Sequence, residues 1–492
     1  MGDRVLNTEK NTKHMTEAFT LSLKKDVSLS ELPENKGIIL QSSTRKLTFN
    51  QPTSGVQTAL KNLYDTGATA AQLVQLVQQV DGTYGIFKFQ SYLQKLISFG
   101  WICHSVLPLA TAIPLASDYQ FLAPVVDWQH QSLRLSRFAY LHSIEEQMVL
   151  ESPLSKAQVI LLDWRSTALT AKLSQPQTCR TLVSEIPQLT EDTAQQFLSL
   201  LLATQMLSVE ASCEQPISEV TNTTLAQWDF HDLLFHSRSR EGRHANPMGG
   251  TYRFLGKIEP LPAIKPRMSE AVIQLYQPDL ENLKSTDFPL TRILEERRSI
   301  RTYHKTPMTA QQLGEFLYRS ARAKTTMNTE VGELSSRPYP SGGGVYELEL
   351  YPIINTCEGI ASGLYHYDPL AHQLCQLSDR TKEVETLLKD AWYASGQQDM
   401  PQVLIAISAR FQRLSWKYES IAYALVLKHV GVLYQTMYLV ATAMNLAPCA
   451  LGGGNADLFA KAAGTDYYAE SSVGEFILGR KPMPSNNREE MT

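Results

Sequence analysis

The chain has 492 residues, a formal charge of −4 at pH 7 and 43% hydrophobic residues, values that fit two to four globular domains. Because basic residues are not in excess, the composition argues against nucleic acid as a partner. The six cysteines include no Cys-x-x-Cys pair, the N-terminus has no signal-peptide core and no uninterrupted apolar run approaches about 18 residues, so we expect a cytoplasmic protein without disulfides, bound metal or a membrane span.

The first 215 residues contain an internal repeat. Apolar residues at 92, 93, 96, 97, 101 and 102 recur at 197, 198, 201, 202, 206 and 207, a constant offset of 105. This spacing predicts a helix followed by a strand in each copy, as in a winged helix. An earlier helical pattern and strand-like runs precede each copy, at 70–77, 19–23 and 38–49 in the first and at 181–186, 133–141 and 148–150 in the second.

We therefore predict two tandem winged-helix domains, over residues 1–110 and 120–212. A winged helix can bind DNA, but the candidate recognition helix at 90–99 carries one lysine and that at 193–203 carries no lysine or arginine, so phosphates would be poorly neutralised. The two units resemble the leader-peptide recognition elements of enzymes that modify ribosomal peptides, which hold an extended peptide at a strand edge. The alternative is that both units serve as scaffold.

Residues 213–289 are predicted to be a linker and wrapping segment. The stretch 214–224 is polar, and five prolines fall between 260 and 289, which favours an irregular, extended chain. The remaining residues, 290–492, then form one further domain. In this domain, Thr309 and Gln312 have the spacing of a capping box that begins a helix running to about Arg322.

Three segments of the last domain point to a ligand with a phosphate group. Arg297, Arg298 and Arg301 surround Ser299, and guanidinium forks and a hydroxyl match phosphate oxygens. Ser341 and Gly342 open a run of three glycines before an alternating strand at 345–351, where the missing Cβ atoms allow close approach of a flat ligand.

The third segment comes late in the chain. Leu451, Gly452 and Gly453 follow a long apolar helix expected from about Tyr418 to Asn445, and Arg480 lies near the C-terminus. The sequence has neither a P-loop nor a Rossmann Gly-x-Gly-x-x-Gly, so a mononucleotide fits better than a triphosphate or a Rossmann-bound dinucleotide. Because the helix is apolar around much of its circumference, we expect it to be buried and to contact a partner subunit.

Lys417 and Tyr418 follow a probable strand at 403–409, where a crevice is expected. A helix beginning at this pair would place its positive dipole end there, and the pKa values of the two groups must fall for base catalysis at neutral pH. Lys428 and His429 are also conspicuous on the apolar helix, but a lone histidine there is more often a hydrogen-bonded core residue. Both stay outside the predicted catalytic set.

Five motifs between about 232 and 479 resemble those of flavin-dependent azoline dehydrogenases, a branch of the nitroreductase fold, and in particular the cyanobactin oxidases. The motifs lie at 235–240, 297–301, 337–342, 416–419 and 450–453. The resemblance implies that Arg297, Ser299 and Arg301, with Arg298 adjacent, bind the phosphate and ribityl of FMN. It also implies that Ser341, Gly342, Leu451 and Gly452 line the isoalloxazine, and that the flavin lies at the interface of a homodimer.

The implied reaction converts thiazolines or oxazolines of a precursor peptide into thiazoles or oxazoles. A hydride leaves Cβ for flavin N5, a base takes the Cα proton, and O2 reoxidises the flavin. Tyr418 assisted by Lys417 is the expected base, with the reverse assignment open. Relatives often end in Lys-x-Arg, whereas this chain has Gly479-Arg480-Lys481, so Arg480 is an expected substitute. Two alternatives are an NAD(P)H-dependent nitroreductase and a non-enzymatic peptide-binding scaffold.

Overall fold

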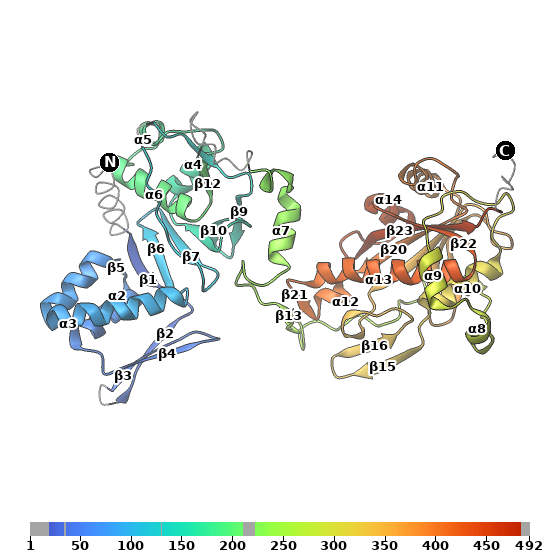
Figure 1. Ribbon diagram of the computed structural model, residues 1–492, viewed down its shortest axis with the longest axis horizontal. Coiled ribbons are helices and arrows are strands. Elements are labelled where there is room, and N and C mark those ends of the chain that lie inside the picture. Colours follow the sequence, from blue (N-terminus) through green and yellow to red (C-terminus); the bar gives the residue numbers. More distant parts are fainter. Residues whose placement is uncertain (1–18, 34–35, 129, 210–221, 484–492) are drawn as a thin grey trace, which may run out of the picture. The chain divides into compact units, whose positions relative to one another are not determined.

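The computed structural model describes residues 19–33, 36–128, 130–209 and 222–483. The chain divides into two compact units, Met1–Asn246 and Pro247–Thr492 (Figure 1). The predicted linker at 214–224 lies mostly outside the described residues.

The first unit contains two segments in which four strands are followed by helices and a further strand. The first copy has β1 (Thr20–Leu23), β2 (Ser28–Glu31), β3 (Gly37–Gln41), β4 (Lys46–Asn50), α2 (Ser54–Asp65), β5 (Ala68–Thr69), α3 (Ala70–Ser98), β6 (Ile102–Val106) and β7 (Ala110–Pro114). The second has β8 (Leu133–Leu135), β9 (Tyr140–Ile144), β10 (Gln147–Glu151), β11 (Ala157–Leu161), α4 (Trp164–Lys172), α5 (Cys179–Glu185), α6 (Glu191–Ala203) and β12 (Leu207–Val209). Helix α3 is kinked at Gly82, whose φ of 66° divides it into two helices.

Strand pairing confirms the repeat that the offset of 105 predicts. In the first copy, the strand after the last helix, β6, pairs antiparallel with β1, and in the second copy β12 pairs in the same way with β8. Helices α2 and α4, which precede the predicted ones, were not expected from the sequence. In α2 the apolar residues at 56, 59, 60 and 63 have the spacing of an amphipathic helix, so this helix was recognisable from the sequence and was overlooked.

Two sheets organise the first unit. Strands β2, β3 and β4 form a three-stranded sheet, β8 and β12 form a separate pair, and the other strands form a seven-stranded sheet in the order β5-β1-β6-β7-β11-β10-β9. The two copies are joined where β7 pairs antiparallel with β11, with Ala112 opposite Val159. After this sheet, η2 (Leu225–Gln227) and α7 (Phe230–Arg238) close the unit, and Arg238 pairs with Glu151 at 3.1 Å.

The second unit is built on one antiparallel sheet in the order β14-β19-β18-β17-β20-β23-β22. Its strands are β14 (Val272–Gln274), β17 (Leu348–Ile354), β18 (Gly363–Asp368), β19 (Gln373–Asp379), β20 (Val403–Arg410), β22 (Leu446–Leu451) and β23 (Glu470–Arg480). Two short pairs flank it, β13 (Gly249–Gly250) with β21 (Tyr418–Glu419) and β15 (Thr325–Thr329) with β16 (Gly332–Ser336). Every residue of β17 and β20 is buried, because helices cover both faces.

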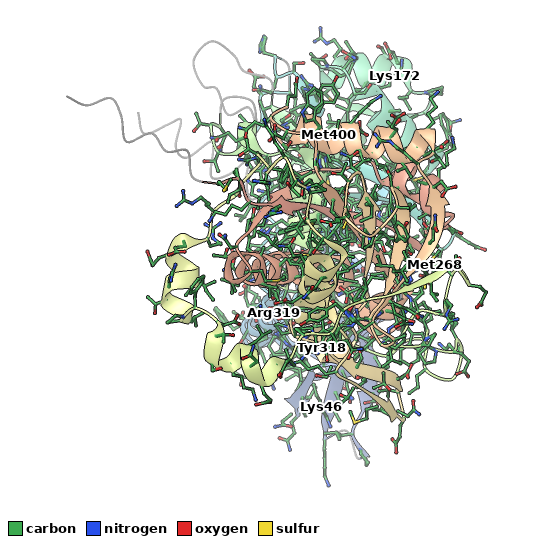
Figure 2. All side chains as sticks on the ribbon, turned by 90° about the vertical axis from the view of Figure 1, so that its right-hand side faces the viewer. Lys46, Lys172, Met268, Tyr318, Arg319 and Met400 are labelled. Atoms are coloured by element: carbon green, nitrogen blue, oxygen red, sulfur yellow. The ribbon has the colours of Figure 1, made fainter. Side chains whose placement is uncertain are left out.

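Helices α10 (Ala310–Ala321) and α13 (Ala422–Ala443) contribute to the core on one face of this sheet, and α11 (Lys382–Ala394) and α14 (Ala456–Ala463) to the core on the other (Figure 1). The remaining helices are α8 (Leu280–Thr286), α9 (Leu290–Glu296), η3 (Gly342–Gly344) and α12 (Phe411–Ser415). The capping box of Thr309 and Gln312 is confirmed at the start of α10. On the same helix, Arg319, next to Tyr318, pairs with Glu315 at 2.9 Å (Figure 2).

The prediction that the long helix begins at about Tyr418 is wrong. Helix α13 begins at Ala422, and Tyr418 instead belongs to the short strand β21. The apolar periodicity continues through this strand, so the sequence pattern could not mark the boundary. By length and composition alone α13 could cross a membrane, as core helices of globular proteins also can. Here its buried residues, among them Leu433 and Met437, pack in the core beside the sheet.

The segment between 247 and 289 lies along the second unit. Arg413 donates to the carbonyl of Leu261, and Arg410 donates to the carbonyl of Pro262 at 2.9 Å. Lys265 pairs with the buried carboxylate of Glu470 at 2.6 Å. Buried arginine, lysine and glutamate side chains therefore hold a proline-rich segment that has little regular structure of its own.

Candidate active site

The glycine run forms a tight turn in front of β17. Ser341 precedes η3, and its Oγ accepts a hydrogen bond from the backbone N–H of Tyr346 at 3.1 Å. Gly343 and Gly344 have φ values of 61° and 68°, in the left-handed region that glycine adopts without a steric penalty. The sequence of three glycines is thus used to reverse the chain before the strand.

Lys417 and Tyr418 lie directly against this turn. A Cβ atom placed on Gly343 would overlap Lys417 Nζ and would stand 2.6 Å from the Tyr418 hydroxyl. Lys417 Nζ also donates to the carbonyl of Gly343 at 3.4 Å. The structure thus brings the predicted catalytic pair to the loop of Ser341 and Gly342, although Gly342 lies 76 residues before Tyr418 in the sequence.

Lys417 and Tyr418 are held by a strand and not by the start of a helix. The expected positive end of a helix dipole at this pair is therefore wrong. Strand β21 pairs with β13, where Gly250 is opposite Tyr418. Tyr252 N–H donates to the Lys417 carbonyl at 3.2 Å, and its ring centroid lies 5.5 Å from Lys417 Nζ. Glu419 binds Thr251 Oγ1 at 3.0 Å, so this carboxylate anchors the covering segment rather than Lys417.

His429 and Glu347 hold the turn from behind. His429 is buried on α13, and its Nε2 accepts from the Gly342 N–H at 2.8 Å. Its Nδ1 is 2.8 Å from Glu347 Oε1, and Glu347 is fully buried. The expectation that His429 is a hydrogen-bonded core residue is confirmed. Its contact with the glycine turn was not foreseen, because nothing in the sequence links position 429 with position 342.

A second buried carboxylate lies two residues further along the alternating run. Glu349 is 1% exposed, and its oxygens are 3.2 Å from His366 Nε2 and 3.3 Å from Arg410. Burial alone would raise the pKa of Glu349, but the hydrogen bond and charge of His366 and the nearby Arg337 and Arg410 lower it to about 2. Glu347 and Glu349 are therefore parts of the interior, and the alternation does not mark a solvent face.

The arginine segment runs beside the last strands of the sheet. The Arg297 guanidinium carbon lies 5.3 Å from the centre of the Tyr438 ring. Ser299 Oγ is 2.7 Å from the Tyr438 hydroxyl, which also accepts from the Ala450 N–H at 2.8 Å. Ile300 N–H donates to the Pro448 carbonyl at 2.8 Å, so this segment follows β22.

The remaining predicted binding residues gather at the ends of the same strands. Arg298 and Arg480 are exposed, and Arg301 is half-buried. The Arg480 carbonyl, at the end of β23, accepts from the N–H of His304, three residues after Arg301. Leu451 ends β22 and is followed by Gly452 and Gly453. Several cationic groups thus remain accessible to a ligand at this edge.

A cavity of about 380 Å³ opens beside the late glycine loop. It is lined by Tyr434, 451–454 and 472–475. A Cβ atom on Gly452 or Gly453 would meet nothing within 4 Å, whereas one on Gly454 would overlap the Glu475 carboxylate. Burial raises the pKa of the Glu475 carboxyl. Tyr434, Tyr438 and Glu475 were missed in the sequence because aromatic and acidic residues at such positions look like ordinary core and strand residues.

The site residues therefore form two groups. The glycine-turn group consists of 341–343, Glu347, Lys417, Tyr418 and His429, and the arginine group consists of 297–301, Tyr438, 451–453 and Arg480. Helix α13 carries a member of each, His429 and Tyr438, nine positions apart. At about 100° and 1.5 Å per residue, they point to opposite sides of the helix, with about 14 Å between them along its axis.

The arginine group suits a flavin mononucleotide. Its guanidinium groups and the Ser299 hydroxyl match a phosphate and a polyol chain, and the glycine loop leaves room for a flat ring beside a cavity. The glycine-turn group has the donors and bases to act on a substrate but no comparable set of phosphate ligands. The residues present are therefore compatible with FMN.

Comparison with known proteins defines the class. Models of the ThcOx helix-turn-helix domain, the cyanobactin oxidase ThcOx and the nitroreductase family match residues 15–123, 133–245 and 294–480, respectively. A curated Methanocaldococcus jannaschii protein, described by its name as a nitroreductase, is 26% identical over 183 residues, which cover 37% of this chain and 84% of that one.

Solved structures are also similar to this chain. One is a nitroreductase from Ralstonia eutropha JMP134, with 20% identity, coverage of 48% of this chain and 98% of that one, and a TM-score of 0.35. Another is the Escherichia coli microcin synthetase complex with a truncated precursor bound, with 18% identity, coverage of 46% and 86%, and a TM-score of 0.31. Nitroreductase-family homologues bind FMN.

The chain is thus a nitroreductase-family oxidoreductase of mixed α+β architecture with an N-terminal helix-turn-helix domain. It belongs to the cyanobactin oxidases, enzymes that oxidise azolines in precursor peptides.

Proposed function

We propose that this chain uses FMN to oxidise thiazolines or oxazolines of a precursor peptide to the aromatic azoles. The observation that carries the proposal is the convergence of Lys417 Nζ and Tyr418 OH on the turn at Gly343. FMN, when bound, supplies a hydride acceptor at N5 for the Cβ hydrogen and then passes the two electrons to O2, which is reduced to hydrogen peroxide. The chain itself must orient the ring and remove the Cα proton.

Tyr418, with Lys417 beside it, is the proposed base for that proton. Both side chains are half-buried, and Lys417 Nζ lies 5.4 Å from the centre of the Tyr418 ring. Their contact with the glycine turn limits their motion, because the Gly343 backbone lies directly under both polar atoms. A base held at hydrogen-bond distance from a bound azoline contributes about 10²- to 10⁴-fold to the rate.

For the cofactor, we propose that Arg297, Arg298, Ser299 and Arg301 bind the phosphate and ribityl, with Arg480 nearby. Leu451, Gly452 and Gly453 would line the ring from one side, and Ser341 and Gly342 from the other. Accessible guanidinium groups beside a glycine loop support this assignment.

We further propose a homodimer with FMN at its interface. His429 and Tyr438 point to opposite sides of α13, so one flavin reaches both groups more easily if they come from different protomers. Tyr423 and Leu427 of α13 are 48% and 42% exposed, and Leu290 and Leu294 of α9 are 63% and 46% exposed. Large apolar side chains at such exposure favour a covering partner. Sedimentation of the FMN-loaded protein as a monomer would rule the dimer out.

The first copy of the repeat is the proposed docking site for the precursor. Strand β4 ends its sheet among the described residues, and Lys88 of α3 donates to Gln51 at 2.9 Å, so the second half of α3 runs beside this edge. Gln51 N–H and Arg45 C=O bond to the β3 side, so the alternate residue Thr48 points its N–H and C=O outward. An extended peptide can add to this edge as a further strand.

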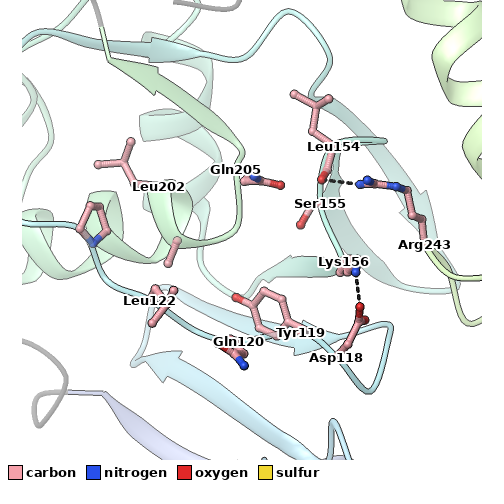
Figure 3. Close-up of a pocket in the computed structure, with 12 residues that line it drawn as sticks. Asp118, Tyr119, Gln120, Leu122, Leu154, Ser155, Lys156, Leu202, Gln205 and Arg243 are labelled. Carbon is pink, nitrogen blue, oxygen red and sulfur yellow. Dashed lines mark hydrogen bonds and ion pairs between the residues drawn. The ribbon is translucent and has the colours of Figure 1, made fainter. Parts of the chain in front are cut away.

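The equivalent edge of the second copy is filled by the chain itself. Strand β7 pairs along β11 from Ala110 to Pro114. Beyond β7 the chain continues between the residues before β11 and the end of α6, where Tyr119, Lys156 and Leu202 line one cavity of about 450 Å³ (Figure 3). The second copy therefore has no free third-strand edge for a peptide, which favours the first copy.

Anaerobic mixing of purified protein with a thiazoline-containing peptide tests the reaction. Loss of the visible flavin absorption, reversed by air, supports azoline oxidation. A flavin reduced by NAD(P)H and not by the peptide would favour the nitroreductase alternative, and a protein that holds no flavin would favour the scaffold.

Fluorescence anisotropy of a labelled precursor tests the docking site. Thr48→Pro removes the outward N–H of β4 and should weaken binding by about tenfold, the value of a lost hydrogen bond plus a displaced edge strand. Thr48→Val retains the N–H and should bind as the unaltered protein does. Equal binding by both variants would overturn the assignment of the β4 edge.

A further inference from the structure

We infer that His429, supported by Glu347, is a positioning residue for azoline oxidation. It holds the glycine turn in the orientation that seats Lys417 and Tyr418, and its effect on the reaction passes through the Gly342–Gly343 backbone. The inference rests on the proposed function, because it assigns a role within that reaction.

The hydrogen bonds of His429 define one tautomer. A backbone N–H can only donate, so the Gly342 N–H at 2.8 Å requires an unprotonated Nε2. The ring proton is then on Nδ1, where it donates to Glu347 Oε1 at 2.8 Å. The imidazole thus joins a backbone donor on one side to a carboxylate acceptor on the other, and neither bond can reverse.

The support behind the imidazole is buried. Glu347 is fully buried, and its second oxygen, Oε2, has no hydrogen-bond partner in the described part of the chain. A buried carboxylate with one unsatisfied oxygen costs stability. The Glu347 carboxylate fixes the imidazole in place, because α13, η3 and the residue before β17 all meet at His429.

The turn passes this restraint to the catalytic pair. A Cβ on Gly342 would stand 3.3 Å from His429 Nε2, and one on the next residue would overlap Lys417 Nζ and approach Tyr418 OH. The turn is therefore packed between the imidazole and the two catalytic side chains. If the Gly342 bond is lost, the turn can move, and the polar atoms that rest on Gly343 move with it.

Three variants separate positioning from general stability. His429→Leu removes both hydrogen bonds, whereas His429→Gln places an amide oxygen near the position of Nε2 and keeps an acceptor for Gly342. Glu347→Gln keeps the shape and an acceptor for Nδ1–H but removes the charge. Met437→Leu, a change of similar volume at another fully buried position of α13, is the matched control for a disturbed helix core.

The measurement is anaerobic single-turnover reduction of the flavin by a thiazoline peptide in the FMN-loaded protein, together with steady-state kcat and KM. For His429→Leu we expect a fall of roughly 30- to 100-fold in the reduction rate and in kcat, since small displacements of reacting groups have effects of this size. KM and flavin content should stay within about twofold of the unaltered protein. His429→Gln should recover most of the rate, and Met437→Leu should keep it.

The outcomes distinguish the two proposals. If the unaltered protein is not reduced by the azoline, the proposed function fails. If it is reduced, and His429→Leu is reduced at the same rate, the positioning role of His429 is wrong. A slow His429→Leu that is not rescued in His429→Gln, or that shares its defect with Met437→Leu, also overturns the inference, because loss of core packing would then explain the result.

Discussion

The glycine-turn group and the arginine group are held in different ways. The glycine-turn group is fixed by hydrogen bonds within the chain. Buried His429 and Glu347 hold the glycine turn, and strand β13 pairs with β21, which contains Tyr418. The second is anchored mainly through Tyr438 and leaves Arg298 and Arg480 exposed. The chain thus fixes the glycine-turn group rigidly and leaves hydrogen-bond donors of the arginine group accessible to a ligand.

The largest effect is expected from substitutions in the glycine-turn group. Tyr418→Phe and Lys417→Ala should lower kcat for azoline oxidation by about 10²- to 10⁴-fold, because general-base catalysis is lost. FMN content should be unchanged, since neither residue belongs to the arginine group. Tyr393→Phe, at an exposed position of α11 that belongs to neither group, is the control in a peroxide-release assay. Full activity of Tyr418→Phe and Lys417→Ala would mean that the base lies elsewhere.

The buried carboxylate of Glu349 predicts an acid sensitivity. The pKa of Glu349 is lowered to about 2 in the folded state, from an ordinary value of about 4.5, so the charged form stabilises the fold above the unfolded pKa. This contribution, on the order of a few kcal/mol, is lost as pH falls from about 4.5 through 2.

Thermal melting of the unaltered protein and of Glu349→Gln between pH 7 and pH 3 measures it. The difference in melting temperature should be constant near neutrality and should shrink below about pH 4.5. A difference that does not vary with pH would show that the charge of Glu349 does not stabilise the fold.

Gly343→Ala and Gly344→Ala form a matched pair at the turn. Both positions have positive φ, so each alanine adds backbone strain of about 1–3 kcal/mol. Only the Cβ at 343 also displaces Lys417 and Tyr418, because the nearest atom to a Cβ at 344 is 3.7 Å away. We expect kcat to fall about tenfold more in Gly343→Ala than in Gly344→Ala. Equal losses would mean that strain alone matters.

The smallest effect is expected from substitutions in the arginine group. Ser299→Ala or Arg301→Ala should raise the dissociation constant of FMN by about tenfold, the value of a hydrogen bond to a charged group. Excess FMN should restore the rate, because the glycine-turn group is intact. Lys284→Ala, which removes an exposed ion pair of α8 with Glu281, is the control in a flavin fluorescence titration. A rate that FMN cannot restore would contradict the division into two groups.

Local signals in the sequence were reliable where short-range physics decides the structure. The capping box at Thr309 and the strand at 403–409 each depend on contacts or periodicities within one element, and the structure has both. The arginine and glycine segments were also recognisable, because their residue types are unusual at such density. Their grouping in space was implied by a resemblance and not by spacing.

The start of α13, by contrast, was placed four residues too early. Apolar periodicity does not distinguish a helix from a short strand that pairs with distant residues, here Gly249 and Gly250. The contact of His429 with Gly342, and the burial of Glu347 and Glu349, were also beyond the sequence. These depend on elements that are separated by tens of residues and come together only in the folded unit.

What the sequence determined by itself is the set of elements and the chemical character of the site: a repeated helix–strand pattern, phosphate-binding donors, a glycine turn and a lysine–tyrosine pair. The tertiary structure decided which of these act together. It closed the edge of the second copy with β7, left β4 at the end of its sheet, and placed His429 on the glycine turn that Lys417 and Tyr418 also contact. The reason is physical: local preferences specify helices, strands and turns, whereas sheet edges and buried hydrogen bonds depend on long-range packing.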